Sequence, residues 1–359
     1  MIIFVEKQNC RIELKIFLRQ FIYYNVFMPN VISVSRRTDI PAFYGDWFMK
    51  RVSEGKAGCI NPFGGSRHTI SLRPEDVIAF VFWSKNAAPF IKHLDELDSR
   101  GYKFYFNLTI NNYTGMFERN VPPWRESVKT ARFLAERYSP DHINWRFDPI
   151  VLSSVTPPET ILKTFKEISA AMSGATHRCY FSFVQYYGKV IRNMLEIGKS
   201  LNIVFRAGKE TEEKFVEKHN GLNDFFAFDL TAEEKTDLTR KMADIAADCG
   251  ISMHTCCDDS LLASLNDSRI EIFKGHCIDK ELLCRITVDK ATAIKLKPTR
   301  PECGCFESRD IGAYDTCPHG CEYCYANSNV KAATVAFQRI SQRSESFSLH
   351  TSIPRHEFP

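Results

Sequence analysis

Three cysteines close together near the end of the chain are the residues best suited to chemistry. Cys317, Cys321 and Cys324 follow one another at a C-x3-C-x2-C spacing. Pro318 and Gly320 favour a tight loop, on which three thiolates can converge on one metal cluster. Three ligands would leave one metal position open, as catalytic metal sites do. The spacing favours an iron–sulfur site, and the alternatives are a structural zinc ion with a fourth ligand from elsewhere, or unligated thiols.

The loop resembles the cluster-binding loop of radical S-adenosylmethionine enzymes, including Tyr323, the aromatic residue just before the third cysteine. The resemblance implies a [4Fe-4S] cluster on the three cysteines, with S-adenosylmethionine bound at the fourth iron. It also implies that an external electron donor, such as flavodoxin or ferredoxin, reduces the cluster. Cleavage of the cofactor then gives a 5′-deoxyadenosyl radical that abstracts hydrogen from a substrate. Tyr325, beside the loop, is a candidate radical relay.

The place of this loop in the chain departs from that superfamily, in which it usually follows the first barrel strand. Here a strand predicted from Asp310 to Tyr314 leads into the loop, and a helix containing Val330 and Phe337 follows it. A circular permutation would account for this, because it changes chain order and keeps spatial order. The start of the helix would then lie near an anionic cluster, which the helix dipole favours.

A longer part of the chain resembles the bacterial family called domain of unknown function 1848. The matching segments are VISVSRRTDIP (31–41), FWSKN (82–86), WRFDP (145–149) and the stretch from RPECGC to the end of the cysteine loop (300–327). That family is similar to DNA-repair photolyases of the spore-photoproduct-lyase kind. The resemblance leaves the substrate unknown, with a nucleic-acid lesion as one option. The competing interpretation is a non-catalytic zinc or iron–sulfur protein with a structural or nucleic-acid-binding role.

A second set of four cysteines precedes the loop in the chain: Cys256, Cys277, Cys303 and Cys305. Gly304 lets the backbone turn tightly within the C-x-C pair. The set is interpreted as a second metal site, either an auxiliary iron–sulfur cluster or structural zinc. Cys257 or His276 can replace one ligand. The alternative is that these cysteines are buried and pack as small apolar side chains.

Polar residues follow several predicted strands, where parallel α/β folds place their ligands. We expect the cofactor to be bound by the following residues: Tyr323, Ser35, Arg36, Arg37, Asp39, Asn107 and Ser182. Arg146 and Asp148 join Tyr325 as candidates for catalysis. Arginine suits a carboxylate or phosphate because it forms two parallel hydrogen bonds with such an anion. The alternative is a network of ion pairs, with Arg146 bound to Asp148.

The arrangement of apolar segments predicts an α/β fold. Short apolar runs alternate with amphipathic helices from Val31 to Cys256, which is typical of βαβ units and a parallel sheet. We predict a full or partial (β/α) barrel, circularly permuted relative to the radical S-adenosylmethionine core, with a doubly wound open sheet as the alternative. Residues 29–343 form this domain and include a cysteine-rich, cluster-binding region at 256–327. Residues 203–223 are highly charged, and we predict an insertion or mobile loop there. The patterning of residues 258–299 is weak.

Composition sets wider limits. The chain has 359 residues, 44% of them hydrophobic and 25% charged, with a formal net charge of +4. This mild charge neither requires nor excludes a nucleic-acid partner. The 13 cysteines, with no visible secretory signal, indicate metal chemistry in the reducing cytoplasm.

The two ends of the chain are expected to lie outside the domain. Residues 1–28 are interpreted as an extension that need not be native, or as a helix lying on a membrane surface. Charges interrupt every apolar run before the roughly 18 residues of a membrane span, so we predict no integral membrane association. Residues 344–359 are predicted to be a disordered tail.

Overall fold

A computed structural model of the protein describes residues 29–61, 64–218, 223–265, 271–288 and 290–342. Within these residues, eight parallel strands form one sheet. They are β1 (Asn30–Val34), β4 (Val77–Ser84), β5 (Phe104–Thr109), β6 (Ile143–Ile150), β7 (Arg178–Phe183), β10 (Ser252–Thr255), β11 (Ile272–Lys274) and β12 (Arg309–Asp310). Their spatial order is β11, β10, β7, β6, β5, β4, β1, β12.

The strand order is that of a partial parallel barrel. From β1 to β11 the strands of the sheet follow one another in chain order, and β12, the last, lies beside the first. No pairing of β11 with β12, which would close a barrel, occurs among the strand pairs of the described residues. The predicted parallel α/β fold is therefore confirmed in its partial form.

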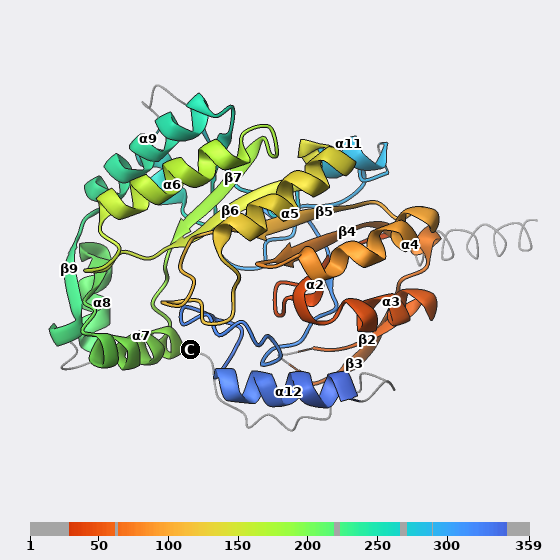
Figure 1. Ribbon diagram of the computed structural model, residues 1–359, viewed down its shortest axis with the longest axis horizontal. Coiled ribbons are helices and arrows are strands. Elements are labelled where there is room, and N and C mark those ends of the chain that lie inside the picture. The colour runs from red at the N-terminus through yellow and green to blue at the C-terminus, as the bar shows by residue number, and fades with distance from the viewer. Residues whose placement is uncertain (1–28, 62–63, 219–222, 266–270, 289, 343–359) are drawn as a thin grey trace, which may run out of the picture.

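Helices cover one face of the sheet (Figure 1). They are α2 (Ile40–Phe43), α3 (Gly45–Ser53), α4 (Leu94–Ser99), α5 (Trp124–Arg137), α6 (Pro158–Met172) and α9 (Ala232–Asp248). Side chains alternate along each strand, so Phe80 and Phe82 of β4 join the core beneath these helices. Phe82 stacks on Phe106 of β5 with ring centroids 4.8 Å apart. A capping box begins α9, with Thr231 and Glu234 bonded reciprocally.

The opposite face of the sheet is filled by the chain between β11 and β12. Val31, Val81 and Tyr105 project into a second core from this face. Leu282 and Leu283 of α11 (Lys280–Thr287) close it, together with the four cysteines of the second set. The space that would be the interior of a barrel is therefore packed with apolar side chains and thiols.

The region predicted as a loop at 203–223 is instead largely ordered secondary structure. It contains β8 (Phe205–Gly208) and α8 (Lys209–Lys218), and β8 pairs in parallel with β9 (Phe226–Leu230). Among the charged residues of α8, the side chain of Phe215 is buried and packs against Phe226, with ring centroids 5.0 Å apart. A buried aromatic residue in a highly charged helix gives a weak periodic signal, so the sequence does not predict this helix.

Several shorter elements complete the fold. These are the hairpin β2 (Lys56–Ile60) and β3 (Arg67–Ser71), and the helices α7 (Gly188–Leu201), α10 (Asp259–Ser264) and α12 (Val330–Gln342). The 3-10 turns are η1 (Pro74–Asp76), η2 (Ala88–His93), η3 (Pro140–His142) and η4 (Asn223–Phe225). The weakly patterned residues 258–299 contain α10, β11 and α11, and the strand there has only three residues.

Two predicted regions, residues 1–28 and 344–359, lie outside the described residues. The described helices include none with the length and apolar character that crossing a membrane requires.

A carboxylate fixes the short strand that leads to the cysteine loop. β12 pairs in parallel with β1, with Arg309 opposite Ile32 and Asp310 opposite Ser33. The Asp310 carboxylate accepts hydrogen bonds from Ser33 Oγ (2.6 Å), Ser35 Oγ (2.7 Å), and the backbone N–H groups of Arg36 (2.9 Å) and Gly312 (2.9 Å). The predicted strand is shorter than expected, but the strand–loop–helix context is confirmed because α12 follows the loop.

Only glycine fits at position 312, two residues after the end of this strand. A Cβ atom at position 312 would lie 2.0 Å from Ser35 Oγ and 2.5 Å from Ser35 Cβ. The side chain of Ser35 is itself held by Asp310, so it cannot move aside without losing that hydrogen bond. The close approach of the two segments therefore depends on Gly312 as well as on Asp310.

Replacing Asp310 should loosen this attachment. Asp310→Ala removes the acceptor of four hydrogen bonds and leaves their donors unsatisfied. We expect the free energy of unfolding in urea to fall by about 3 kcal/mol. Arg309→Ala, at an exposed position of the same strand, is the control and should change it by less than about 0.5 kcal/mol. Equal losses in the two variants would contradict the role given to Asp310.

Candidate metal centre

The cysteine loop is held at the carboxyl edge of the sheet by the loop that follows β5. The backbone N–H of Asn120 donates to the His319 carbonyl at 2.9 Å, and the N–H of Glu322 donates to the Phe117 carbonyl at 2.9 Å. Asn120 Nδ2 also donates to the Pro318 carbonyl at 2.8 Å. These bonds fix the backbone on both sides of the second cysteine.

The three loop thiols are free and partly exposed. Burial raises the pKa of each, that of Cys317 to about 12, and Cys324 raises the pKa of Cys317 and Cys321 further because the sulfurs are neighbours. Backbone N–H groups act in the opposite direction, including that of Ala326, which lies 3.3 Å from Cys324 Sγ. Such N–H groups stabilise thiolates, and hydrogen bonds of this kind surround iron–sulfur clusters.

By the chemistry of its donors, the loop fits a thiolate-bound cluster. In the described part of the chain, no three His, Cys, Asp or Glu side chains converge closely enough to hold a single metal ion. A [4Fe-4S] cluster does not require such convergence, because each thiolate binds a different iron atom. The donor set of the loop, three thiols, therefore fits three of the ligands of such a cluster.

A buried ion pair lies directly behind the loop. Lys85 Nζ is 2.7 Å from Glu118 Oε1 and 2.9 Å from the hydroxyl of Tyr323, which also donates to Glu118. Asn111 Nδ2 lies 3.3 Å from the same hydroxyl. Burial alone would lower the pKa of Lys85, but Glu118 and Cys321 outweigh it and raise this pKa. The ammonium group is thus held charged beside the second cysteine.

Asp39, which we expect to bind a cofactor, contacts the loop. Its carboxylate caps α2 at Ala42 N (2.9 Å) and accepts hydrogen bonds from Lys85 N (2.7 Å) and His319 Nε2 (2.7 Å). The other ring nitrogen of His319 faces the Asn120 carbonyl at 3.1 Å. Asp39 and His319 are both buried, so this group ties β1, β4 and the cysteine loop together.

Three further residues expected to bind the cofactor, Ser35, Arg36 and Arg37, directly follow β1 in the chain. They lie next to the end of β12. Ser35 is bonded to Asp310, and Arg37 Nη1 donates to the Gly312 carbonyl at 3.4 Å. The Arg36 guanidinium lies 4.9 Å from the centre of the Trp83 ring, and its Nη2 is buried with no hydrogen-bond partner among the described residues. Arg36 is therefore the member of this group with a buried donor left for an anion.

The exposed side chain of Tyr325 is close to this group. It is 46% exposed, and its hydroxyl donates to the Arg36 carbonyl at 2.7 Å. Desolvation of the phenol, together with the adjacent Cys324, raises the pKa of Tyr325 above its ordinary value. The candidate relay thus lies beside the loop, as its place in the sequence indicates.

The remaining predicted residues belong to the other face of the sheet. Arg146 forms an ion pair with Asp148, as the alternative interpretation proposed, and Ser182 donates a hydrogen bond to the same carboxylate. Arg146 Nη1 lies 2.7 Å from Cys277 Sγ, and Asn107 Nδ2 lies 3.2 Å from the Cys277 carbonyl. Arg146 and Asn107 therefore contact the second cysteine set, whereas Asp39 contacts the loop to which Tyr323 belongs.

The second set is brought together by the fold. Cys256 Sγ is 4.0 Å from Cys277 Sγ, and the N–H of Cys305 lies 3.4 Å from Cys303 Sγ. All four side chains are buried in the second core. Of the two proposed substitutes, Cys257 lies 4.0 Å from Cys256 Sγ, whereas His276 Nδ1 faces the Gly304 carbonyl.

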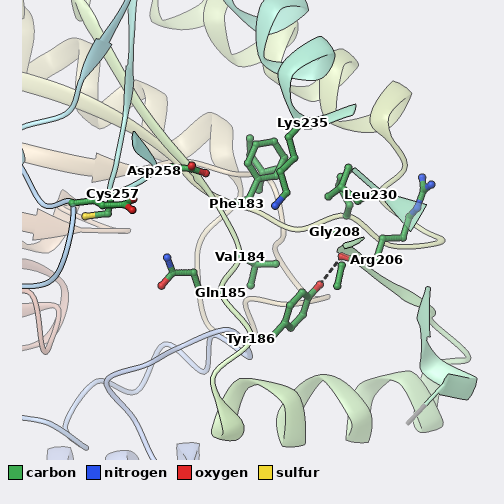
Figure 2. A pocket seen from close by; sticks show the side chains of 14 residues that line it. Phe183, Val184, Gln185, Tyr186, Arg206, Gly208, Leu230, Lys235, Cys257 and Asp258 are labelled. Carbon is green, nitrogen blue, oxygen red and sulfur yellow. Dashed lines mark hydrogen bonds between the residues drawn. The ribbon is translucent and has the colours of Figure 1, made fainter. Parts of the chain in front are cut away.

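A cavity of about 300 Å³ opens next to this set. Cys257, Asp258 and Glu302 form one side of it, and Arg206 and Lys235 the other. Figure 2 shows Cys257 and Asp258 across the cavity from Arg206 and Leu230, with Gln185 and Tyr186 between them. The lining combines both signs of charge with apolar carbon, which suits a polar organic molecule.

Sequence reasoning missed several of these residues for identifiable reasons. Lys85 lies in the FWSKN segment, but nothing in its neighbourhood indicated a buried partner. Glu118 lies between an apolar and a basic residue in a loop with no periodicity. Arg206 belongs to the region that we predicted as an insertion. Only tertiary contacts bring these side chains to their sites.

The chain belongs to the family described as domain of unknown function (DUF1848), whose model matches residues 31–326. No curated protein matches it. Two solved structures are weakly similar. A putative alpha-L-fucosidase from Bacteroides thetaiotaomicron is 10% identical, with 88% of this chain and 92% of that one covered and a TM-score of 0.29. A citrate lyase from Burkholderia xenovorans is 11% identical, with 61% and 78% covered and a TM-score of 0.21. Such low scores support no argument about fold or function.

Removing one partner of the buried ion pair between Lys85 and Glu118 should destabilise the protein. Glu118→Ala leaves the Lys85 ammonium group buried without its counter-charge, and we expect a loss of about 3–5 kcal/mol in the free energy of unfolding. Lys85→Met in the same background should restore part of that loss. The control is Glu167→Ala, at an exposed pair with Arg125 that should contribute less than about 1 kcal/mol. Urea unfolding measures all three, and a Glu118→Ala protein as stable as the control would refute the assignment.

Proposed function

We propose that this protein is an iron–sulfur enzyme of the radical S-adenosylmethionine type, with a [4Fe-4S] cluster on Cys317, Cys321 and Cys324. The observation that carries the proposal is the position of three free thiols on a loop between a parallel strand and a helix, at the carboxyl edge of the sheet. When bound, the cluster would supply an electron for reductive cleavage of S-adenosylmethionine.

The residues around the loop have supporting roles in this proposal. Lys85 places a positive charge beside Cys321, which favours the thiolate that a cluster needs. Asp39 and His319 fix the loop against β1 and β4. The unsatisfied Nη2 of Arg36 is suited to a carboxylate or a phosphate, and we propose that it contacts the carboxylate of the cofactor.

Sheet topology supports the permutation. β12, the loop and α12 form a strand–loop–helix unit, and β12 lies beside β1 at the end of the strand order. A first unit moved to the end of the chain would occupy that position. We therefore propose that residues 309–342 correspond to the first unit of the radical S-adenosylmethionine core.

The electron and the substrate come from outside this chain. We propose a flavodoxin or ferredoxin as the electron donor and the cytoplasm as the compartment, since free thiols persist there. The cavity between Cys257 and Arg206 is the proposed substrate site, and its mixed charges suit a polar substrate. A damaged nucleotide is one candidate, because its base and phosphate would find apolar and basic groups in the lining.

The test is cofactor cleavage. Anaerobically reconstituted, reduced protein given S-adenosylmethionine should release 5′-deoxyadenosine, measured by liquid chromatography. Cys321→Ala should reduce release to background because it removes one of the ligands. Cys249→Ser, a cysteine at the end of α9 remote from both sets, should retain the activity of the unaltered protein.

Two results would count against the proposal. A cluster-loaded, reduced protein that forms no 5′-deoxyadenosine would exclude this chemistry. A colourless protein with stoichiometric zinc would favour the competing structural metalloprotein.

A further inference from the structure

Unpaired charges of opposite sign line the two sides of the cavity described above. On one side, the Lys235 ammonium group forms no ion pair with a carboxylate of the described chain. The other cation on this side, Arg206, is already paired with Asp229, with its Nε 2.7 Å from Oδ1. Lys235 is therefore the group on this side that has a positive charge left for a ligand.

Two strands fix the position of this ammonium group. Lys235 Nζ lies 5.7 Å from the centre of the Phe183 ring on β7, and Figure 2 shows the two side chains together. It also lies against the backbone of β8, where a Cβ atom at Gly208 would be 3.2 Å from Nζ and 2.4 Å from the Leu230 carbonyl oxygen. The ammonium group is therefore held at the wall of the cavity by β7 and β8.

The opposite side of the cavity has two carboxylates. Asp258 Oδ1 caps α10 by accepting a hydrogen bond from Leu261 N at 2.9 Å, which leaves Oδ2 for a ligand. Glu302 Oε2 accepts a hydrogen bond from the N–H of Asp259 at 3.1 Å. Neither Asp258 nor Glu302 forms an ion pair in the described chain, because the nearby Arg300 contacts a thiol and an amide instead. Two negative charges are therefore available on this side.

Apolar side chains also line the cavity. Ile150, Leu152 and Leu230 are each at most 5% exposed, and the ring of Phe183 adds a flat apolar face. Charges beside such walls interact more strongly than charges in open solvent, because the local dielectric constant is lower. A ligand with a charged group at each end and a hydrocarbon between them would find a partner along its whole length.

We infer that this cavity binds a zwitterion, with the ligand's carboxylate at Lys235 and its ammonium group at Asp258 and Glu302. The inference rests on the proposed function, which makes this cavity the substrate site, and it names the substrate class as an amino acid. A zwitterion satisfies both sides at once, whereas an anion or a cation alone leaves one side unpaired. A nucleotide offers a phosphate to Lys235 but no ammonium group to the two carboxylates, so it matches one side only.

The experiment is a calorimetric titration of the anaerobically reconstituted protein with zwitterions of increasing length: glycine, β-alanine, γ-aminobutyrate and ε-aminocaproate. S-Adenosylmethionine is left out because it is itself a zwitterion. One length should bind best, since the separation of its charges must match that of the two sides. Butyrate and butylamine, which have one charge each, should bind at least about tenfold more weakly than the best zwitterion.

Two variants assign the ends of the ligand. Lys235→Met keeps the aliphatic stem and should weaken binding of the best zwitterion and of butyrate by about tenfold or more, with butylamine unchanged. Asp258→Asn keeps a side chain that can cap α10, and it should weaken binding of the zwitterion and of butylamine instead. If Asp258→Asn does not fold, Glu302→Gln, at an exposed position, tests the same side. Lys241→Met, at an exposed ion pair on the same helix as Lys235, is the control and should bind every ligand as the unaltered protein does.

Three results would overturn the inference. They are no measurable binding of any zwitterion at millimolar concentration, equal affinities in the unaltered protein and both variants, and tighter binding of uridine monophosphate than of every zwitterion. The outcomes also separate the inference from the proposed function. Zwitterion binding without formation of 5′-deoxyadenosine would leave the inference standing and refute the proposed function. Release of 5′-deoxyadenosine by a protein that binds no zwitterion would do the reverse.

Discussion

The hydrogen bonding of one carboxylate, that of Asp310, fixes the two ends of the domain together. β12 contains only two residues, so the backbone pairing of β12 with β1 is small. The Asp310 side chain adds bonds to Ser33, Ser35 and the backbone of Arg36 and Gly312. These bonds place the start of the cysteine loop at the carboxyl edge of the sheet, although the loop is far from β1 in the chain.

This attachment also determines how the two cysteine groups are related. The loop lies at the edge of the sheet and the second set, Cys256, Cys277, Cys303 and Cys305, in the core on its opposite face, and Arg36 lies between them. The backbone carbonyl of Arg36 accepts a hydrogen bond from Tyr325 beside the loop. Against the effect of burial, Cys305 and Cys277 of the second set raise the pKa of its guanidinium group. This face of the sheet is therefore covered by a packed, thiol-rich core. The cavity opens beside the second set, and Cys257, which neighbours Cys256, lines it.

Local patterns predicted much of this arrangement. Apolar runs such as VIAFVFW mark strands buried on both faces, and the spacing of Cys317, Cys321 and Cys324 is enough to identify the loop. What could not be predicted depends on contacts between distant residues. Glu118 has no local signal and acquires a role only when its loop pairs with the cysteine loop. The places of Asp39 and Ser182 near strand ends could be predicted, but their partners, His319 and Asp148, could not, because they come from distant segments. β11 is too short to show periodicity, and α8 shows one buried aromatic among charges.

The proposed function is tested most directly by the electron paramagnetic resonance spectrum of the reduced protein, recorded with and without S-adenosylmethionine. In the proposed function, three thiolates on the loop would leave one iron of the cluster open, so S-adenosylmethionine should change the g-values and line shape of that cluster. A reduced cluster on the loop whose spectrum is unaffected by saturating S-adenosylmethionine would contradict the proposed function.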